Sequence, residues 1–100
     1  MAREQFQTLS ESMFYILLAL REESCGVDIM EKVEKISRGR VSVGPGTLYA
    51  MLQKFENSGV IRQTRQECRK KWYVNTNLGS SMLEDEITRL QNMILDAENA

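Results

Sequence analysis

One short segment of this chain combines side chains that can bind a nucleic acid. The segment 45–57 begins Pro-Gly-Thr-Leu-Tyr, and Pro suits the first position of a helix because its missing N–H group would be unpaired there anyway. Gln can pair with an adenine edge through two hydrogen bonds, and Ala or the Thr methyl group can contact a thymine methyl group. Tyr and Lys can bind phosphate groups. The sequence therefore predicts a helix that contacts DNA through its outer face, with the contact residues Gly46, Thr47, Tyr49, Ala50, Gln53 and Lys54.

A basic segment follows this helix. Residues 62–71 carry five positive charges and one acid, Glu67, which gives a local charge of +4. We expect two paired strands at 60–65 and 71–76, joined by a polar loop at 66–70. A helix beside such a ribbon is typical of a DNA-binding winged helix, although a basic hairpin can also be no more than a solvated tip. The predicted wing contacts are Arg65, Arg69, Lys70 and Lys71.

Apolar spacing predicts two helices that position the DNA-contacting one. Thr8 and Glu11 form a capping-box pattern in front of an apolar run that ends at Leu20. That first helix is apolar on most of its circumference, which suggests burial against its own domain and against a second subunit. A second helix is expected from about Gly26 to Ile36.

Glycines and a short apolar segment predict how these helices end and connect. Gly39 is the expected stop of the second helix, and Gly59 ends the helix that begins at Pro45. Between them, Val41 to Val43 could form a short strand, which favours the winged variant of the helix-turn-helix.

The last helix carries a heptad pattern of apolar residues. It is expected to start near Thr76 or near Ser81, where Ser81 and Glu84 offer a second capping box. Two heptads are too few for an independent coiled coil, so the seam needs a folded body beside it. The simplest interpretation is a dimer interface, and the alternative is closure over the chain's own core. The predicted dimerisation residues are Leu83, Ile87, Leu90, Ile94 and, from the first helix, Phe14.

The formal charge separates along the chain. The net charge is −1, but residues 78–100 hold one Arg against five acids, or −4, so residues 1–77 hold twelve basic against nine acidic side chains, or +3. We accordingly expect a winged-helix DNA-binding unit at 1–77 and a dimerisation helix at 78–100. A weak positive balance predicts weak non-specific DNA affinity.

Composition argues against several other classes of protein. The longest apolar run, Met13 to Leu20, is far shorter than the roughly 20 residues that cross a bilayer, so no membrane partner and a cytoplasmic location are expected. Cys25 and Cys68 are too few for a disulfide framework, and without His they complete no metal site, so neither a metal nor a cofactor is predicted. The chain lacks a nucleophile with a base and a phosphate loop, so we do not expect an enzyme.

Several of these motifs together resemble the PadR family of bacterial transcriptional repressors. They are the run from Ser12 to Leu20, the Gly-Pro-Gly-Thr-Leu-Tyr segment 44–49, and the Lys-Trp-Tyr strand 71–73 that leads to Thr76 and Gly79. The match extends from about residue 9 to residue 95. The resemblance implies a mostly α fold with a small β-wing, a third helix in the major groove, a wing at the backbone or minor groove, and a C-terminal dimerisation helix.

The chain also departs from the family pattern at three positions. Asn75 stands where the family usually has Leu, which predicts looser packing of the second wing strand. Glu67 and Cys68 replace the usual Gly and Arg at the wing tip, which predicts weaker wing contacts. Short members of the family include regulators that bind aromatic or cationic drugs at the dimer centre. For this chain such a cleft for a small apolar ligand would be lined by Met13, Phe14, Met93 and Ile94.

Two hypotheses from different classes remain at this stage. In the first, the chain is a dimeric repressor that binds an inverted-repeat operator and is relieved by a small apolar or aromatic ligand. In the second, it is a winged-helix protein–protein interaction module without DNA binding, because fold does not fix function. The weak net charge and the acid in the wing favour the second, whereas the combination of helix and basic ribbon favours the first.

Overall fold

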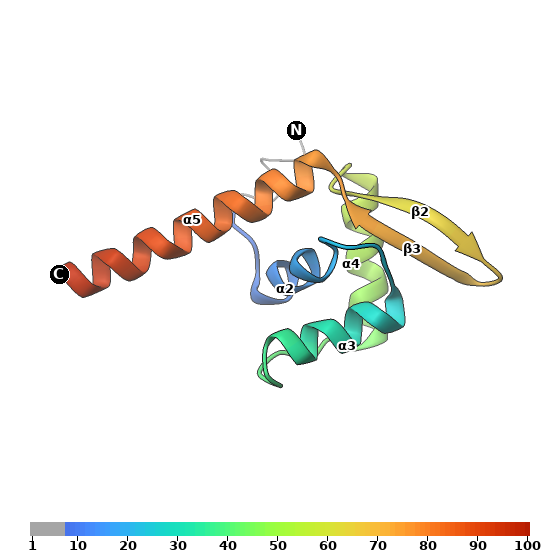
Figure 1. Cartoon of the computed structure of the whole chain (residues 1–100), viewed down its shortest axis with the longest axis horizontal. Coiled ribbons are helices and arrows are strands. Elements are labelled where there is room, and N and C mark those ends of the chain that lie inside the picture. Colours follow the sequence, from blue (N-terminus) through green and yellow to red (C-terminus); the bar gives the residue numbers. More distant parts are fainter. Residues whose placement is uncertain (1–7) are drawn as a thin grey trace.

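The central strand of a small antiparallel sheet joins the two ends of this molecule. A computed structural model describes residues 8–100, and its sheet has the strand order β1-β3-β2. Helices α2, α3 and α4 pack together beside the sheet, whereas α5 and the β2–β3 hairpin extend from them in opposite directions (Figure 1). The elements are α2 (Glu11–Ala19), β1 (Ser24–Cys25), α3 (Gly26–Ile36), α4 (Pro45–Asn57), β2 (Ile61–Glu67), β3 (Lys70–Asn75) and α5 (Asn77–Asn99).

The predicted fold class, mostly α with a small β-wing, is confirmed. The bounds expected for α3 and α4 agree with the structure, because their start and stop signals are local. Pro45 occupies the first turn of α4, and Gly39 and Gly59 adopt φ angles of 78° and 74°, the left-handed region that favours glycine after a helix. One side of each helix faces the core, whose largest fully buried side chains include Ile16, Leu17, Leu20, Ile29, Leu48, Leu52 and Phe55.

The predicted capping boxes of the first and last helices are both wrong. Helix α2 begins at Glu11, and its N-cap is Ser10, whose hydroxyl accepts a hydrogen bond from the Met13 N–H group at 3.2 Å. Thr8 lies two residues before this N-cap, and Leu9 between them is buried in the core. Thr76 caps α5 by accepting from the Gly79 N–H group, so Ser81 lies inside the helix and does not cap it.

Val41 to Val43 do not form the predicted strand. The Ser37 hydroxyl accepts from the Val41 N–H group at 3.0 Å and donates to the Val41 carbonyl at 3.2 Å. These bonds satisfy the backbone groups that a strand would pair, while both valines remain buried. The third strand is β1 instead, in which Ser24 pairs with Tyr73 and Cys25 with Trp72.

The predicted wing loop at 66–70 is also wrong, because the strands run further toward the tip. Glu67 pairs with Lys70, which leaves only Cys68 and Arg69 in the turn. Cys68 is exposed and has a φ angle of 55°. The hairpin extends away from the body of the protein (Figure 1).

Asn75 ties the central strand to α2. Its side-chain amide donates to the Leu17 carbonyl at 2.9 Å, and its backbone N–H group donates to the Leu20 carbonyl at 3.0 Å. Asn75 therefore supplies hydrogen bonds to carbonyls at the end of α2. These bonds take the place of the apolar packing that the usual Leu would provide.

Helix α5 starts against the body and then leaves it. Met82, Leu83 and Glu86 are buried, and Arg89 makes two hydrogen bonds to Glu86, at 2.8 and 2.6 Å. The Arg89 side chain, more than the neighbouring Leu9 backbone, lowers the pKa of the Glu86 carboxyl below its usual value. Within residues 8–100 no helix has the length and apolar character needed to span a bilayer.

We predict that Gly79→Ala destabilises the fold. An added Cβ would lie 2.2 Å from the Val60 carbonyl oxygen, which already accepts hydrogen bonds from the backbone and hydroxyl of Thr76. The backbone must shift to admit it, so the free energy of unfolding should fall by about 2 kcal/mol in urea denaturation. Gly46→Ala is the matched control, because a Cβ there meets open space. Equal stability of both variants would refute this close approach.

Candidate nucleic-acid interface

The outer face of α4 holds all six predicted contact residues. Leu48, Leu52 and Phe55 are buried and attach the helix to the core. Because these residues recur at helical spacing, the positions between them face away from the core. The six residues on that outer face are all exposed, as predicted: Gly46, Thr47, Tyr49, Ala50, Gln53 and Lys54.

A cavity of about 530 Å³ lies beside this face, between α4, the start of α3 and strand β3. Tyr49 and Gln53 line it from α4, and the wing contributes a basic wall. The structure therefore brings part of the predicted helix contacts and most of the predicted wing contacts to one concave surface. The wing residues that line the cavity are Arg69, Lys70 and Lys71.

Glu56 and Tyr73 also line the cavity, although the sequence did not identify them as site residues. Glu56 stands one helical turn after Gln53 and opposes the charge of the basic wall. Tyr73 projects from β3 and is only 7% exposed. Burial, then the nearby Glu56 carboxylate and then Tyr49, raise the pKa of the Tyr73 phenol. Helical spacing from Tyr49 could have identified Glu56, but the position of Tyr73 depends on long-range strand pairing.

Arg65, the fourth predicted wing residue, does not line this cavity. Consecutive strand residues point to opposite faces of a sheet, so Trp72 lies on the face opposite to Tyr73. Arg65 pairs with Trp72 across the hairpin, and its guanidinium carbon lies 3.9 Å from the centre of the indole ring. An irregularity in the register between Gln63 and Arg65 aims the Arg65 side chain this way.

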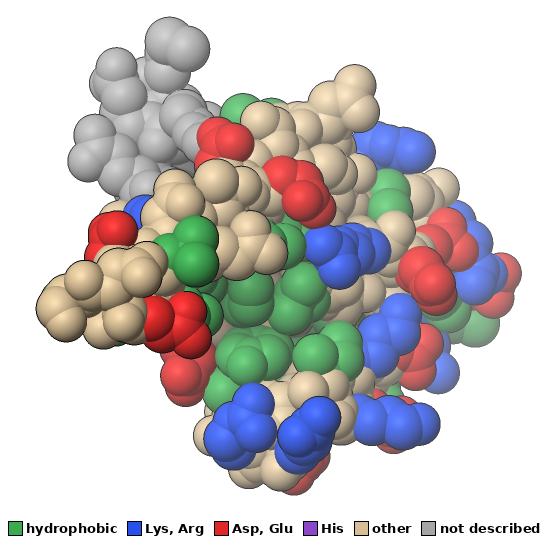
Figure 2. All heavy atoms as spheres, turned by 60° about the vertical axis from the view of Figure 1, so that its left-hand side comes forward, with side chains coloured by type: hydrophobic (Ala, Val, Ile, Leu, Met, Phe, Trp, Pro, Cys, Tyr) green, Lys and Arg blue, Asp and Glu red, His purple; other side chains and the backbone are tan. Residues whose placement is uncertain are grey.

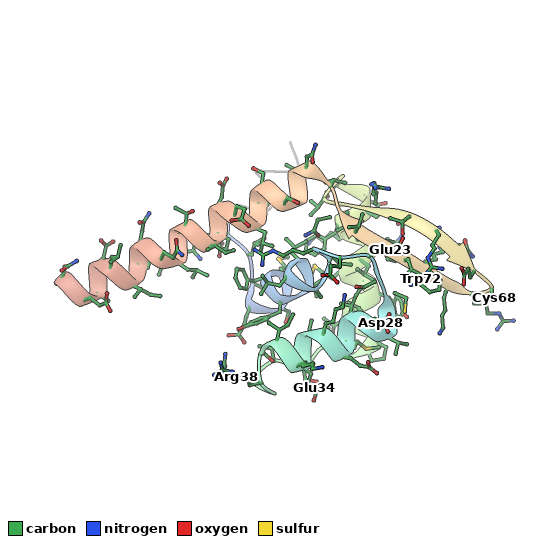
Figure 3. The ribbon with its side chains drawn as sticks, viewed as in Figure 1. Glu23, Asp28, Glu34, Arg38, Cys68 and Trp72 are labelled. Atoms are coloured by element: carbon green, nitrogen blue, oxygen red, sulfur yellow. The ribbon has the colours of Figure 1, made fainter. Side chains whose placement is uncertain are left out.

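Two carboxylates hold Arg65 on that face. Its Nε lies 3.3 Å from Glu23, just before β1, and its terminal nitrogen pairs with Glu67 of the same strand. The adjacent Thr64 hydroxyl, and after it Arg65, hold the pKa of the Glu23 carboxyl below its usual value. Figure 3 shows Glu23 near Trp72 along the hairpin, with Cys68 at its tip. The positive charge of Arg65 is therefore balanced within the chain.

The predicted dimerisation residues divide into two groups along α5. Leu83 is buried in the chain's own core, and Ile87 and Leu90 are half-buried. Ile94 is 59% exposed and lies on the part of the helix that extends from the body. The seam thus covers its own core at the start of the helix, as the alternative interpretation held, and leaves an exposed apolar segment further on.

The predicted ligand residues lie on two helices and differ in exposure. Met13 and Phe14 are half-buried on α2, and Met93 and Ile94 are more than half exposed on α5. The cavity beside α4 includes none of the four. Figure 2 shows hydrophobic side chains gathered in the hollow beside α5, with basic side chains at its lower edge and acidic side chains along the helix.

Comparison with known proteins identifies a family. The model of the transcriptional regulator PadR-like family matches residues 16–85. A transcriptional regulator from Clostridium thermocellum has the same fold, with a TM-score of 0.72 and 17% identity over 88% of this chain and 89% of that one. A PadR-like transcription factor from Bacteroides fragilis gives 0.69 and 23% identity, over 88% and 86% of the two chains.

A third solved structure is more similar in sequence. It is Bacillus subtilis PadR in complex with operator DNA, with 30% identity and a TM-score of 0.64. The match covers 75% of this chain and 45% of that one. No curated protein sequence matches significantly.

We predict that Arg69 and Arg65 contribute unequally to duplex binding. Arg69→Ala removes a cation from the concave surface and should weaken binding to any duplex while lowering the slope of log affinity against log salt by about 0.9. Arg65→Ala is the matched control and should change that slope much less, because Glu23 and Glu67 already balance its charge. Fluorescence anisotropy over a salt series measures both. Equal slopes for the two variants would show that the pairing of Arg65 is irrelevant.

Proposed function

The chain belongs to the PadR-like family of transcriptional regulators, and we propose that it acts as a dimeric repressor that binds a specific DNA operator. The observation that carries this proposal is the concave surface on which the outer face of α4 meets the basic wall of the wing. A family relative that is 30% identical has been solved with operator DNA, which supports the same partner here.

In this proposal α4 enters the major groove. Thr47, Ala50 and Gln53 approach base edges, where Gln can pair with adenine and a methyl group can contact thymine. Tyr49 and Lys54 bind phosphates, and the wing residues Arg69 to Lys71 contact the backbone beside the groove. The exposure of every one of these residues supports the assignment, because contact needs no rearrangement of the core.

The second subunit covers the exposed part of α5. Met93, Ile94 and Leu95 are each more than half exposed on consecutive positions, an apolar segment that a monomer would leave in water. The rest of this helix is acidic, and the loop after α3 carries Arg38 and Arg40. Figure 2 shows a hydrophobic hollow beside α5, with acidic side chains along the helix and basic side chains at the lower edge of the hollow. A two-fold arrangement would place α5 of one copy in the hollow of the other, with acidic and basic surfaces opposed.

Two-fold symmetry determines the form of the operator. Two recognition helices in successive major grooves lie about 34 Å apart, one turn of DNA, and demand an inverted repeat. Selection from a random duplex pool should therefore enrich an inverted repeat, and binding of the enriched sites should weaken steeply with added salt. Failure to enrich any site, with only feeble binding at low salt, would contradict the repressor and leave the protein–protein interaction module.

We expect Ile94→Asp to separate the two subunits. A carboxylate in the apolar segment would be buried at the interface without a partner, so gel filtration at micromolar concentration should show a monomer where the unchanged chain is a dimer. The same variant should lose binding of planar aromatic cations in calorimetry, because the proposed ligand cleft needs Met93 and Ile94 beside Met13 and Phe14 of a dimer.

Asn92→Asp is the control for this variant. It adds the same charge two residues away, about 200° around the helix from position 94, and should leave the dimer intact. A monomeric unchanged chain would refute the interface. A dimer that binds none of the cations would refute that class of ligand alone.

A further inference from the structure

Gly26 lies where the start of α3 meets the Tyr49 side chain in the cavity beside α4. It is the first residue of α3 and does not adopt a left-handed conformation, so its backbone would accept Ala. A Cβ at this position, however, would fall 2.3 Å from the Tyr49 hydroxyl oxygen and 2.8 Å from the adjoining ring carbon. A Cβ here would therefore displace the Tyr49 side chain, whose hydroxyl lies directly over the start of α3.

The start of α3 has backbone donors that no side chain caps. Cys25 is the N-cap residue, and its side chain makes no capping hydrogen bond. The first N–H groups of a helix have no partner within the helix, and the helix dipole makes this end attractive to anions. Cys25, Gly26 and Val27 all line the cavity, so this end of α3 opens into it.

Tyr73 supplies independent evidence that the cavity is built to hold a polar ligand. More than nine-tenths of its side chain is buried, and it lines the cavity from the wall opposite α3 and α4. Buried phenol groups normally find a hydrogen-bond partner. Within residues 8–100, however, none of the hydrogen bonds of the structure involves its hydroxyl. That hydroxyl is therefore available to a group that enters the cavity.

We propose that this cavity binds a phosphate group, and that the group belongs to the DNA backbone. The phosphate would accept hydrogen bonds from the first N–H groups of α3 and from the hydroxyls of Tyr49 and Tyr73, while Lys71 balances its charge. This inference rests on the proposed function and adds α3 and Tyr73 to the surface that binds DNA. The sequence had assigned the phosphates to α4 and the wing alone.

The DNA backbone is favoured over a free phosphorylated molecule by what surrounds the cavity. Gln53, a proposed base-contacting residue, lines the same cavity as the basic wall of the wing. A strand whose bases lie against α4 would therefore pass its backbone between α3 and the wing. A volume of about 530 Å³ is in the range of sites that hold a group of several atoms, and it exceeds what a single phosphate needs.

Among the described residues, Glu56 is the one carboxylate that lines the cavity, against the three cations Arg69, Lys70 and Lys71. A bound phosphate would be repelled by it, so Glu56 should weaken DNA binding. The proposal therefore predicts that removal of the Glu56 charge increases the affinity for DNA.

The test compares four variants for duplex affinity by fluorescence anisotropy. Gly26→Ala displaces the Tyr49 hydroxyl, and Tyr73→Phe removes one donor, so each should weaken binding about tenfold without a change in salt slope. Lys71→Gln should weaken binding and lower the slope by about 0.9. Glu56→Gln should tighten binding severalfold. Thermal melting of each variant without DNA checks that it is folded. If Gly26→Ala is not folded, the affinity of Tyr73→Phe tests the phosphate site.

Matched controls lie outside the cavity. Tyr15→Phe removes a hydroxyl from a half-buried tyrosine of α2, and Lys35→Gln removes a cation from the last turn of α3. Both should bind DNA as the unchanged chain does. If the unchanged chain binds duplex with a steep salt dependence while Tyr73→Phe and Glu56→Gln bind equally well, the phosphate site is refuted and the proposed function stands. If the unchanged chain binds no duplex, both are refuted.

A titration with inorganic phosphate separates the two sources of the group. The NMR signals of residues 25–27 report this binding. We expect a dissociation constant in the millimolar range, because the DNA backbone contributes affinity through many neighbouring phosphates and a free ion does not. Gly26→Ala should abolish the binding. Micromolar binding of inorganic phosphate that does not compete with duplex would overturn the assignment to DNA and indicate a free phosphorylated ligand.

Discussion

The pairing of β3 with strands on both of its sides fixes the relative positions of the parts that bind and assemble. One edge of β3 pairs with β1, which leads directly into α3, and the other edge pairs with β2 of the wing. At its end, Asn75 donates both its side chain and its backbone N–H group to carbonyls of α2. A strand of six residues thus holds the start of α3, the wing and the first helix in one arrangement.

The alternation of side chains along β3 divides the wing into two surfaces with different electrostatic roles. Tyr73 and Lys71 point to the cavity, whereas Trp72 points to the other face and carries the stacked Arg65. Two acids neutralise Arg65 there, so the charge of +4 counted along residues 62–71 overstates the charge available to DNA. Fewer wing cations are therefore available to DNA phosphates than a count along the sequence suggests.

Local signals in the sequence were enough to predict the helices, but pairing between distant segments was not. Pro45 and Gly59 mark the ends of α4 through their own backbone preferences, and Gly39 lies in the turn with positive φ that follows α3, so α3 and α4 were predicted with their correct bounds. Strand β1 has two residues, and nothing in Ser24 or Cys25 indicates a strand until β3 lies beside them. A strand was predicted instead at Val41 to Val43, because valine is β-branched.

The same distinction applies to the candidate site. Exposure of the α4 contact residues follows from helical periodicity, which the sequence contains. The separation of Arg65 from Arg69 follows from the register of the hairpin and from Glu23, which lies 42 residues away in the chain. Neither register nor that distant carboxylate is apparent in a linear run of basic residues. A basic segment therefore predicts that a wing is present, but not which of its cations face a ligand.

The absence of a linker between the wing and α5 would make the proposed dimer interface and the DNA contact mechanically dependent on each other. Thr76 alone separates β3 from α5, and it both caps α5 and donates its N–H group and hydroxyl to the Val60 carbonyl. Arg21, just after α2, pairs with Glu84 of α5 at 3.1 Å. In the proposed dimer, a rotation of α5 at the subunit interface would act on the sheet through Thr76 and its bonds to Val60. In a two-fold dimer such a rotation changes the distance between the two recognition helices, which is the quantity that an inverted repeat selects.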